Sequence, residues 1–166
     1  MKKSIAVLVA AIALIALPAS DLSAQVALGP QFVLVDVEEP AIGVRVDFGL
    51  GEAFGIQDGF FEGLFGTVNG NYVFVDGPGT NLVFNANLAV PITTAAAVSP
   101  YVGAGFNINR YSVDVAGVNV SNNNTGLNLL GGLFFNIGAL PAAVEAQYST
   151  TGSGYLSLGA ALLFGL

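Results

Sequence analysis

Three residue types are absent from this chain, and each absence excludes a class of chemistry. The sequence contains no cysteine, no tryptophan and no histidine. Without cysteine there is no disulfide framework, no thiol nucleophile and no thiolate metal site. Without histidine, a serine hydrolase of the Ser/His/acid type lacks its general base, and imidazole metal ligands are missing. We therefore expect a protein that is not an enzyme and that holds no metal or cofactor.

Charged residues are also scarce. They make up 9% of the chain, whereas a soluble domain usually has about 25%. Apart from Lys2 and Lys3, the basic residues are Arg45 and Arg110. This scarcity argues against nucleic-acid binding and against a basic grip on lipopolysaccharide. A surface so poor in charge is hard to keep soluble, whereas a surface that faces lipid needs no charge.

The first residues have the pattern of a secretory signal peptide. Two lysines are followed by an apolar run over residues 5–17 and then by small and polar residues. The run is too short for a membrane-spanning helix, which needs about 20 residues. We expect cleavage after Ala24, with Ala19 as the second candidate. Residues 1–24 are then a cleaved signal peptide, and residues 25–166 form one domain with two basic and ten acidic residues, a net charge of −8.

Long apolar runs are missing beyond the signal peptide, and apolar residues instead alternate with small or polar ones. A period of two places side chains on opposite faces of a β-strand. The alternation is clear in six segments: 41–50, 81–90, 101–109, 127–138, 143–149 and 155–166. Two less regular segments, 26–36 and 60–75, complete a set of eight, and Pro30 in the first of them indicates an edge or a bulge.

An apolar chain without spanning helices can still cross a membrane as a closed β-barrel, which leaves no unpaired edge. The strand lengths are near the 9–11 residues or so that a tilted membrane strand needs. The fold class we predict is all-β, an eight-stranded antiparallel up-and-down transmembrane β-barrel. With both termini in the periplasm, the outer loops are 36–41, 76–80, 113–126 and 150–154, and the inner turns are 50–59, 91–99 and 139–142. We expect a bulge or strand end near Arg110.

A soluble periplasmic β-barrel that binds a small apolar ligand is the main alternative fold. Its polar face would point to water. In this chain the less apolar face consists mostly of Gly, Ala, Ser and Asn. Such small residues suit the crowded interior of an eight-stranded barrel, and they therefore favour the membrane barrel.

Three charged residues are predicted to face the lumen as a polar cluster: Arg45, Asp47 and Glu145. They would form either a polar path for solutes or an internal ion pair that fixes the barrel core. Because buried charges must be paired and the lumen of such a barrel is narrow, we favour the ion pair. Glu62 is a further carboxylate for acid–base chemistry, but no spacing among these acids specifies a catalytic site.

A second acidic group, Asp36, Glu38 and Glu39, falls in the first outer loop. Oxygen ligands of this kind can bind a divalent cation. No ligand spacing supports such a site, and we favour a solvated loop.

Several segments resemble those of a known family. Residues 100–106 (PYVGAGF), 126–132 (GLNLLGG) and 144–149 (VEAQYS) are similar to the fifth, sixth and seventh strands of small OmpA/OmpX/OmpW-like outer-membrane β-barrels. The last strand resembles the C-terminal signal of that family, although the chain ends in Leu166 where the family usually has phenylalanine, with Phe164 two positions earlier.

The resemblance implies a place in the bacterial outer membrane, contact with its lipids, and insertion by the barrel-assembly machinery. It also implies a structural or surface-interaction role in the envelope, and the longest polar loop, 113–126, is the candidate binding surface. The alternative function is a narrow channel for small or hydrophobic solutes.

Overall fold

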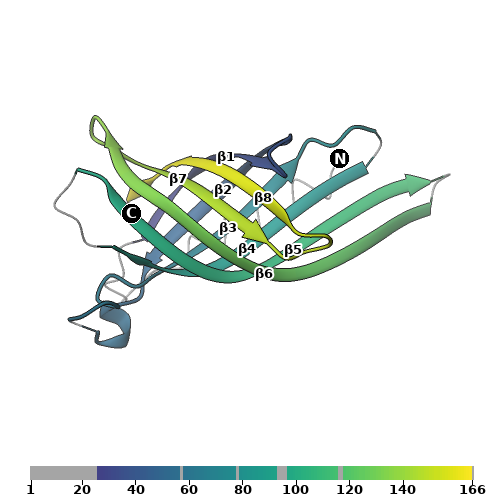
Figure 1. Ribbon diagram of the computed structural model, residues 1–166. Coiled ribbons are helices and arrows are strands. Elements are labelled where there is room, and N and C mark those ends of the chain that lie inside the picture. The colour runs from purple at the N-terminus through teal and green to yellow at the C-terminus, as the bar shows by residue number, and fades with distance from the viewer. Residues whose placement is uncertain (1–25, 57, 78, 93–96, 116–117, 166) are drawn as a thin grey trace.

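The computed structural model describes residues 26–56, 58–77, 79–92, 97–115 and 118–165. The expected signal peptide, residues 1–24, and both of its candidate cleavage sites lie outside the described residues. The described part of the chain forms a single closed sheet (Figure 1).

The sheet is built from antiparallel neighbours in chain order. The strands are β1 (Val26–Val35), β2 (Glu39–Gly49), β3 (Phe65–Val73), β4 (Gly79–Pro91), β5 (Ser99–Val115), β6 (Val118–Ile137), β7 (Leu140–Ser149), β8 (Tyr155–Leu162) and β9 (Phe164–Gly165). β1 pairs with β2 on one side and with β8 and β9 on the other, which closes the barrel. β8 and β9 are one strand interrupted at Leu163, so the predicted eight-stranded antiparallel barrel is confirmed.

A short 3₁₀ helix, η1 (Glu52–Phe54), interrupts the connection between β2 and β3. No helix in the described ranges is long and apolar enough to cross a membrane. We call the end of the barrel with the 50–64 connection the inner end, and the end with the β1–β2 turn and the β5–β6 hairpin the outer end.

Alternation along the strands turns apolar side chains outward and polar ones inward. Phe106 and Leu129 on the outer wall are 66% and 65% exposed. The inward side chains include many buried polar residues, among them Gln31, Arg45, Asp47, Asn69, Asn71, Asn85, Asn87, Asn107, Asn128 and Gln147. This is the reverse of a water-soluble barrel, and it is the pattern of a barrel whose outer wall faces lipid. The structure therefore does not support the alternative of a soluble periplasmic barrel.

The barrel closes along a seam that is interrupted at Pro30. The two strands have the same register on both sides of the interruption, so no bulge is present. The aligned pairs are Gln31↔Ala161, Phe32↔Ala160, Val33↔Gly159 and Leu34↔Leu158 after Pro30, and Ala27↔Gly165 and Leu28↔Phe164 before it. Proline has no backbone N–H to give to the ladder. At the gap, Leu163 donates its backbone N–H to the carbonyl of Pro141 at 2.8 Å. A Cβ atom on Gly29 would lie 1.6 Å from the carbonyl oxygen of Leu162, so the two strands approach closely here.

The expected long loop 113–126 is largely strand, which corrects the prediction from sequence. β5 continues to Val115 and β6 begins at Val118, in one register from Ser99↔Phe134 to Val115↔Val118. For the same reason the expected bulge near Arg110 is wrong. Beyond the barrel rim both faces of a strand are in water, so pairing persists without the apolar–polar alternation that reveals strands inside a membrane.

The inner connection between β2 and β3 is longer than expected, because β3 begins only at Phe65. Residues 60–64, predicted as strand, belong to this connection, where the rings of Phe60 and Phe61 pack edge to face 5.2 Å apart. The backbone N–H groups of Leu50 and Gly51 donate to the carbonyl of Leu64 at 2.8 and 3.0 Å, which ties the two ends of the connection together.

Candidate functional site

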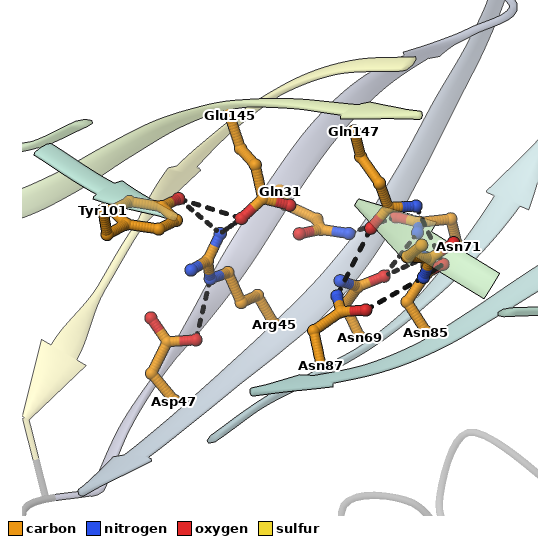
Figure 2. A network of polar contacts seen from close by, with 11 residues as sticks. Gln31, Arg45, Asp47, Asn69, Asn71, Asn85, Asn87, Tyr101, Glu145 and Gln147 are labelled. Carbon is orange, nitrogen blue, oxygen red and sulfur yellow. Dashed lines mark hydrogen bonds and ion pairs between the residues drawn. The ribbon is translucent and has the colours of Figure 1, made fainter. Parts of the chain in front are cut away.

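The three charged residues predicted for the lumen lie together in it (Figure 2). Arg45 and Asp47 come from β2, and Glu145 comes from β7. Arg45 donates from Nε to Asp47 Oδ1 at 2.8 Å and from Nη1 to Glu145 Oε2 at 3.0 Å. Tyr101 of β5 joins the cluster by donating its hydroxyl to Glu145 Oε2 at 2.9 Å. Arg45 is only 2% exposed, so the group forms part of the barrel core.

The local sequence makes room for this cluster. Arg45 and Asp47 are two positions apart, so both side chains point to the same face of β2. Glu145 is aligned with Gly132 on the neighbouring strand. A Cβ atom on Gly132 would lie 2.3 Å from the ring of Tyr101. The glycine therefore allows a tyrosine ring to cross the lumen at the level of the glutamate.

The cluster holds one more negative than positive charge, because Arg45 faces both Asp47 and Glu145. Two of its polar atoms, Arg45 Nη2 and Asp47 Oδ2, are buried with no hydrogen-bond partner in the described part of the chain. Charges taken out of water must be paired and hydrogen-bonded to be tolerated. The arrangement is that of an internal ion pair in which one carboxylate oxygen, Asp47 Oδ2, has no partner in the described part of the chain.

An aromatic layer packs beside Arg45 toward the inner end of the barrel. The ring centroids of Phe65 and Tyr101 are 5.5 Å apart, those of Tyr101 and Phe134 are 4.6 Å apart, and those of Phe65 and Phe134 are 5.4 Å apart. Arg45 Cζ lies 5.8 Å from the ring centroids of both Tyr101 and Phe134, within the range of a cation–π contact. Sequence reasoning missed this layer; the only signal was three aromatic residues in phase with the small-residue face of their strands.

A network of amide side chains fills the lumen on the outer side of the charged cluster. Its centre is Asn85 Oδ1, which accepts from Asn107 Nδ2 at 2.8 Å, from Asn128 Nδ2 at 3.0 Å and from Gln147 Nε2 at 3.0 Å. Asn85 in turn donates to Asn69 Oδ1 at 2.7 Å. Three further amides extend the network: Gln31, Asn71 and Asn87. The sequence placed the asparagines of β4 on one face but gave no sign that six strands contribute to one network.

Little space remains between these groups. The cavity bordered by both the amides and the charged cluster has a volume of about 30 Å³, roughly the share of one water molecule in the liquid. A larger cavity of about 570 Å³ opens at the inner end, and Asp47 and Glu62 are among its lining residues. Among the described residues, the lumen is therefore nearly filled at mid-height, and the larger of these two cavities lies toward the inner end.

The acidic group of the first outer loop does not form a metal site. Within the described ranges, no three Asp, Glu, His or Cys side chains are arranged to hold a metal ion. Asp36 lies instead in the tight turn between β1 and β2, where Asp36 and Val37 have positive φ angles of 53° and 61°. Glu39 pairs with Val35 as the first residue of β2.

Comparisons with known proteins agree on the fold. No protein-family model and no curated protein matches the sequence. Among solved structures, the N-terminal β-barrel domain of Pseudomonas aeruginosa OprF matches with a TM-score of 0.60 and 12% identity, over 84% of this chain and 97% of that one. Ail, the attachment invasion locus protein of Yersinia pestis, matches with a TM-score of 0.59 and 17% identity, over 85% and 97%. A de novo designed transmembrane β-barrel matches with a TM-score of 0.54 and 10% identity, over 86% and 95%. The chain therefore has the fold of small outer-membrane β-barrels.

Proposed function

We propose that this chain is an exported, non-enzymatic β-barrel of the bacterial outer membrane that acts at the cell surface through its β5–β6 hairpin. The apolar outer wall supports the membrane location, because side chains that face lipid need to be apolar. One protein with the same fold, Ail, is named for attachment and invasion. With the inner end in the periplasm, the hairpin stands on the outside of the cell.

The observation that carries this proposal is the free edge of β6. β5 and β6 extend past the other strands at the outer end (Figure 1). β6 pairs with β7 only from Asn128 onward, where β7 ends at Ser149. Residues 118–125 therefore pair with β5 alone, and no strand in the described part of the chain covers their other edge.

The register identifies which backbone groups face that edge. Leu127 donates to Thr150 Oγ1 at 2.9 Å and accepts from the N–H of Thr150 at 2.9 Å, so its backbone groups point toward β7. Along an antiparallel strand, the backbone N–H and C=O groups of successive residues point to opposite sides. In the free part of β6, the residues whose backbone groups point to the same side as those of Leu127 are therefore Asn119, Ser121, Asn123 and Thr125.

This edge lacks the features that normally block pairing with another chain. Residues 118–125 contain no charged residue and no proline, and such residues are the usual protection of exposed strands. Val118, at the tip, is 64% exposed. An extended segment of another protein can add to such an edge, with backbone hydrogen bonds supplying the affinity.

The filled lumen favours this role over the alternative of a narrow channel. Eight-stranded barrels have interiors that side chains just fill, and the cavity bordered by Arg45 and the amides has a volume of only about 30 Å³, which supports a closed lumen. Partners such as membrane lipid and the barrel-assembly machinery remain part of this proposal.

Fractionation with a heat-shift gel tests the membrane location. The full chain is expressed in a Gram-negative host, and its outer membranes are run with and without boiling. A folded barrel resists detergent until boiled, because its sheet is closed on itself in the part that spans the membrane. We expect a heat-dependent shift in the outer-membrane fraction; a soluble periplasmic band without a shift would contradict the proposal.

A pair of matched variants tests the hairpin. In S121P/N123P, proline removes two N–H groups from the free edge and leaves pairing with β5 intact. S121A/N123A changes the same side chains and keeps the edge. Cells carrying each variant are compared for retention on surfaces coated with collagen, mucin or albumin. Retention above the empty vector that is lost with proline and kept with alanine supports edge pairing; equal loss in both variants, or no retention by the unmodified chain, contradicts it.

A further inference from the structure

The cavity at the inner end has the size and lining of a ligand site and lies at the opposite end of the barrel from the hairpin. Its volume is about 570 Å³, within the range of roughly 300–1,000 Å³ that is usual for small-molecule pockets. Many of the residues that line it are apolar, and Phe65, Phe134 and Leu163 are the ones among them whose side chains pack inside the barrel. Its polar lining residues are Asp47, Glu62, Ser99 and Asn136.

One lining residue presents a carboxylate oxygen that the protein leaves unpartnered. Asp47 is 7% exposed, and its Oδ1 accepts from Arg45 Nε at 2.8 Å. Its Oδ2 is buried and has no hydrogen-bond partner in the described part of the chain; Figure 2 shows this oxygen pointing away from the guanidinium. A buried acceptor on a charged group is unfavourable unless something donates to it.

The charge balance around the cavity indicates which kind of ligand fits. The single positive charge of Arg45 faces the two carboxylates of Asp47 and Glu145. Glu62 is a further acidic residue of the cavity lining, and none of the described residues that line the cavity is basic. A ligand that carries a positive charge would offset this excess of negative charge.

The aromatic wall adds a preference for an organic cation. Phe65 and Phe134, with centroids 5.4 Å apart, both line the cavity. Aromatic faces attract cations and pack against apolar groups. A bare divalent metal ion needs six to eight or so oxygen ligands, and the two carboxylates here are too few.

We propose that the inner cavity binds a small organic cation, an ammonium group on an apolar or aromatic body. The negative charge of Asp47 attracts the ammonium, and the body packs against Phe65 and Phe134. Glu62 at the same cavity attracts the charge without direct contact being required.

Binding of phenethylammonium to the full chain tests this proposal. The protein is refolded into nanodiscs of phosphatidylglycerol, which has no amine, and titrated by NMR with phenethylammonium and with 2-phenylethanol, a neutral analogue of similar size. We expect the alcohol to bind at least about tenfold more weakly, since it carries no charge for the carboxylates to attract. Equal affinity for the two compounds, or no binding of the ammonium, would overturn the proposal.

Two variants and a control assign the binding to Asp47. D47N keeps an acceptor for Arg45 Nε but removes the charge, so phenethylammonium affinity should fall about tenfold while the alcohol is unaffected. E62Q should lower the affinity for phenethylammonium by only about twofold, because the Glu62 carboxylate is solvated. D58N, in the same 50–64 connection but outside the cavity lining, should bind as the unmodified chain does. If D47N folds by the heat-shift test and its affinity for phenethylammonium is unchanged, the assignment of binding to Asp47 is overturned. If D47N does not fold, the comparison of phenethylammonium with 2-phenylethanol on the unmodified chain decides.

An ammonium group can come from two sources, a free amine in solution or the headgroup of a lipid. Repeating the titration in nanodiscs that contain phosphatidylethanolamine distinguishes them. A several-fold weaker apparent affinity for phenethylammonium supports the site with the headgroup as occupant, whereas an unchanged affinity supports it with a free solute.

Discussion

Arg45 Nη1 lies 3.0 Å from Glu145 Oε2, although 100 positions separate the two residues in the sequence. The contact joins β2 to β7 across the lumen, between strands that are not neighbours in the sheet. It exists only when the barrel is closed, so the ion pair couples the buried charges to completion of the fold.

Removal of Arg45 should destabilise the barrel more than removal of the Glu145 charge. R45Q leaves two buried carboxylates without a counter-charge, and breaking a buried pair in this way costs about 3–5 kcal/mol. E145Q keeps an acceptor for Tyr101 and leaves the Arg45–Asp47 pair balanced, so the loss should be about 1 kcal/mol. Urea unfolding in lipid vesicles measures both, with D58N as the exposed-carboxylate control. Equal losses in the two variants would refute the charge-balance argument.

The unmodified barrel should not conduct ions steadily in a planar bilayer. Asn85, Asn128 and Gln147 meet at mid-height, and the remaining cavity there is about 30 Å³. Replacing all three with alanine removes these amides but leaves Arg45, Glu145 and the aromatic layer in the lumen, so this variant should also remain without steady conductance. The matched control is the triple alanine variant of Asn119, Asn122 and Asn124, which lie in the part of β6 that pairs with β5 alone. A stable conductance of the unmodified chain would contradict the filled lumen.

The β1–β2 turn is predicted to store backbone strain. Val37 has a φ of 61°, a left-handed conformation that costs a residue with a Cβ about 1–2 kcal/mol, and tight hairpin turns of this kind prefer Asn-Gly. The double variant D36N/V37G should therefore raise the free energy of unfolding by about 1 kcal/mol. V118G makes the same exchange at an exposed valine without a positive φ and should not raise the free energy of unfolding. An increase of similar size in V118G would show that relief of backbone strain is not the cause.

Closure of the barrel should depend on Gly29. A Cβ at this position would lie 1.6 Å from the carbonyl oxygen of Leu162, so G29A forces β1 away from the last strand. We expect a large drop in the folded fraction on a heat-shift gel after refolding into vesicles. Gly165 lies on the same seam with nothing within 4 Å of its missing Cβ, and G165A should fold normally. Similar yields for the two variants would mean that the seam tolerates displacement.

Strands inside the barrel wall were predictable because their two faces differ in kind. In β5, Phe106 points outward and Asn107 inward, and this contrast repeats at every second residue. The contrast disappears where a strand leaves the barrel. Tyr111 and Ser112 remain paired with β6, but water contacts both faces there, so the sequence carries no periodic signal for the outer parts of β5 and β6.

The charged cluster was predictable for a different reason. Charges are rare in this chain, and Arg45, Asp47 and Glu145 each fall on the less apolar face of a strand. The aromatic layer was not predictable, since Phe65 or Phe134 on an inward face reads like one more apolar residue. The inner cavity depends on how strands distant in sequence are staggered around the barrel, which the alternation along a single strand does not specify.

The amide network limits the part of the barrel interior in which acid can change the hydrogen bonds. Carboxamide groups do not ionise, so the hydrogen bonds centred on Asn85 carry no proton that a change of surroundings can add or remove. The described carboxylates that hydrogen-bond within the lumen are Asp47 and Glu145, both toward the inner end. The half of the interior toward the outer end is therefore expected to keep the same hydrogen bonds in acidic and in neutral surroundings.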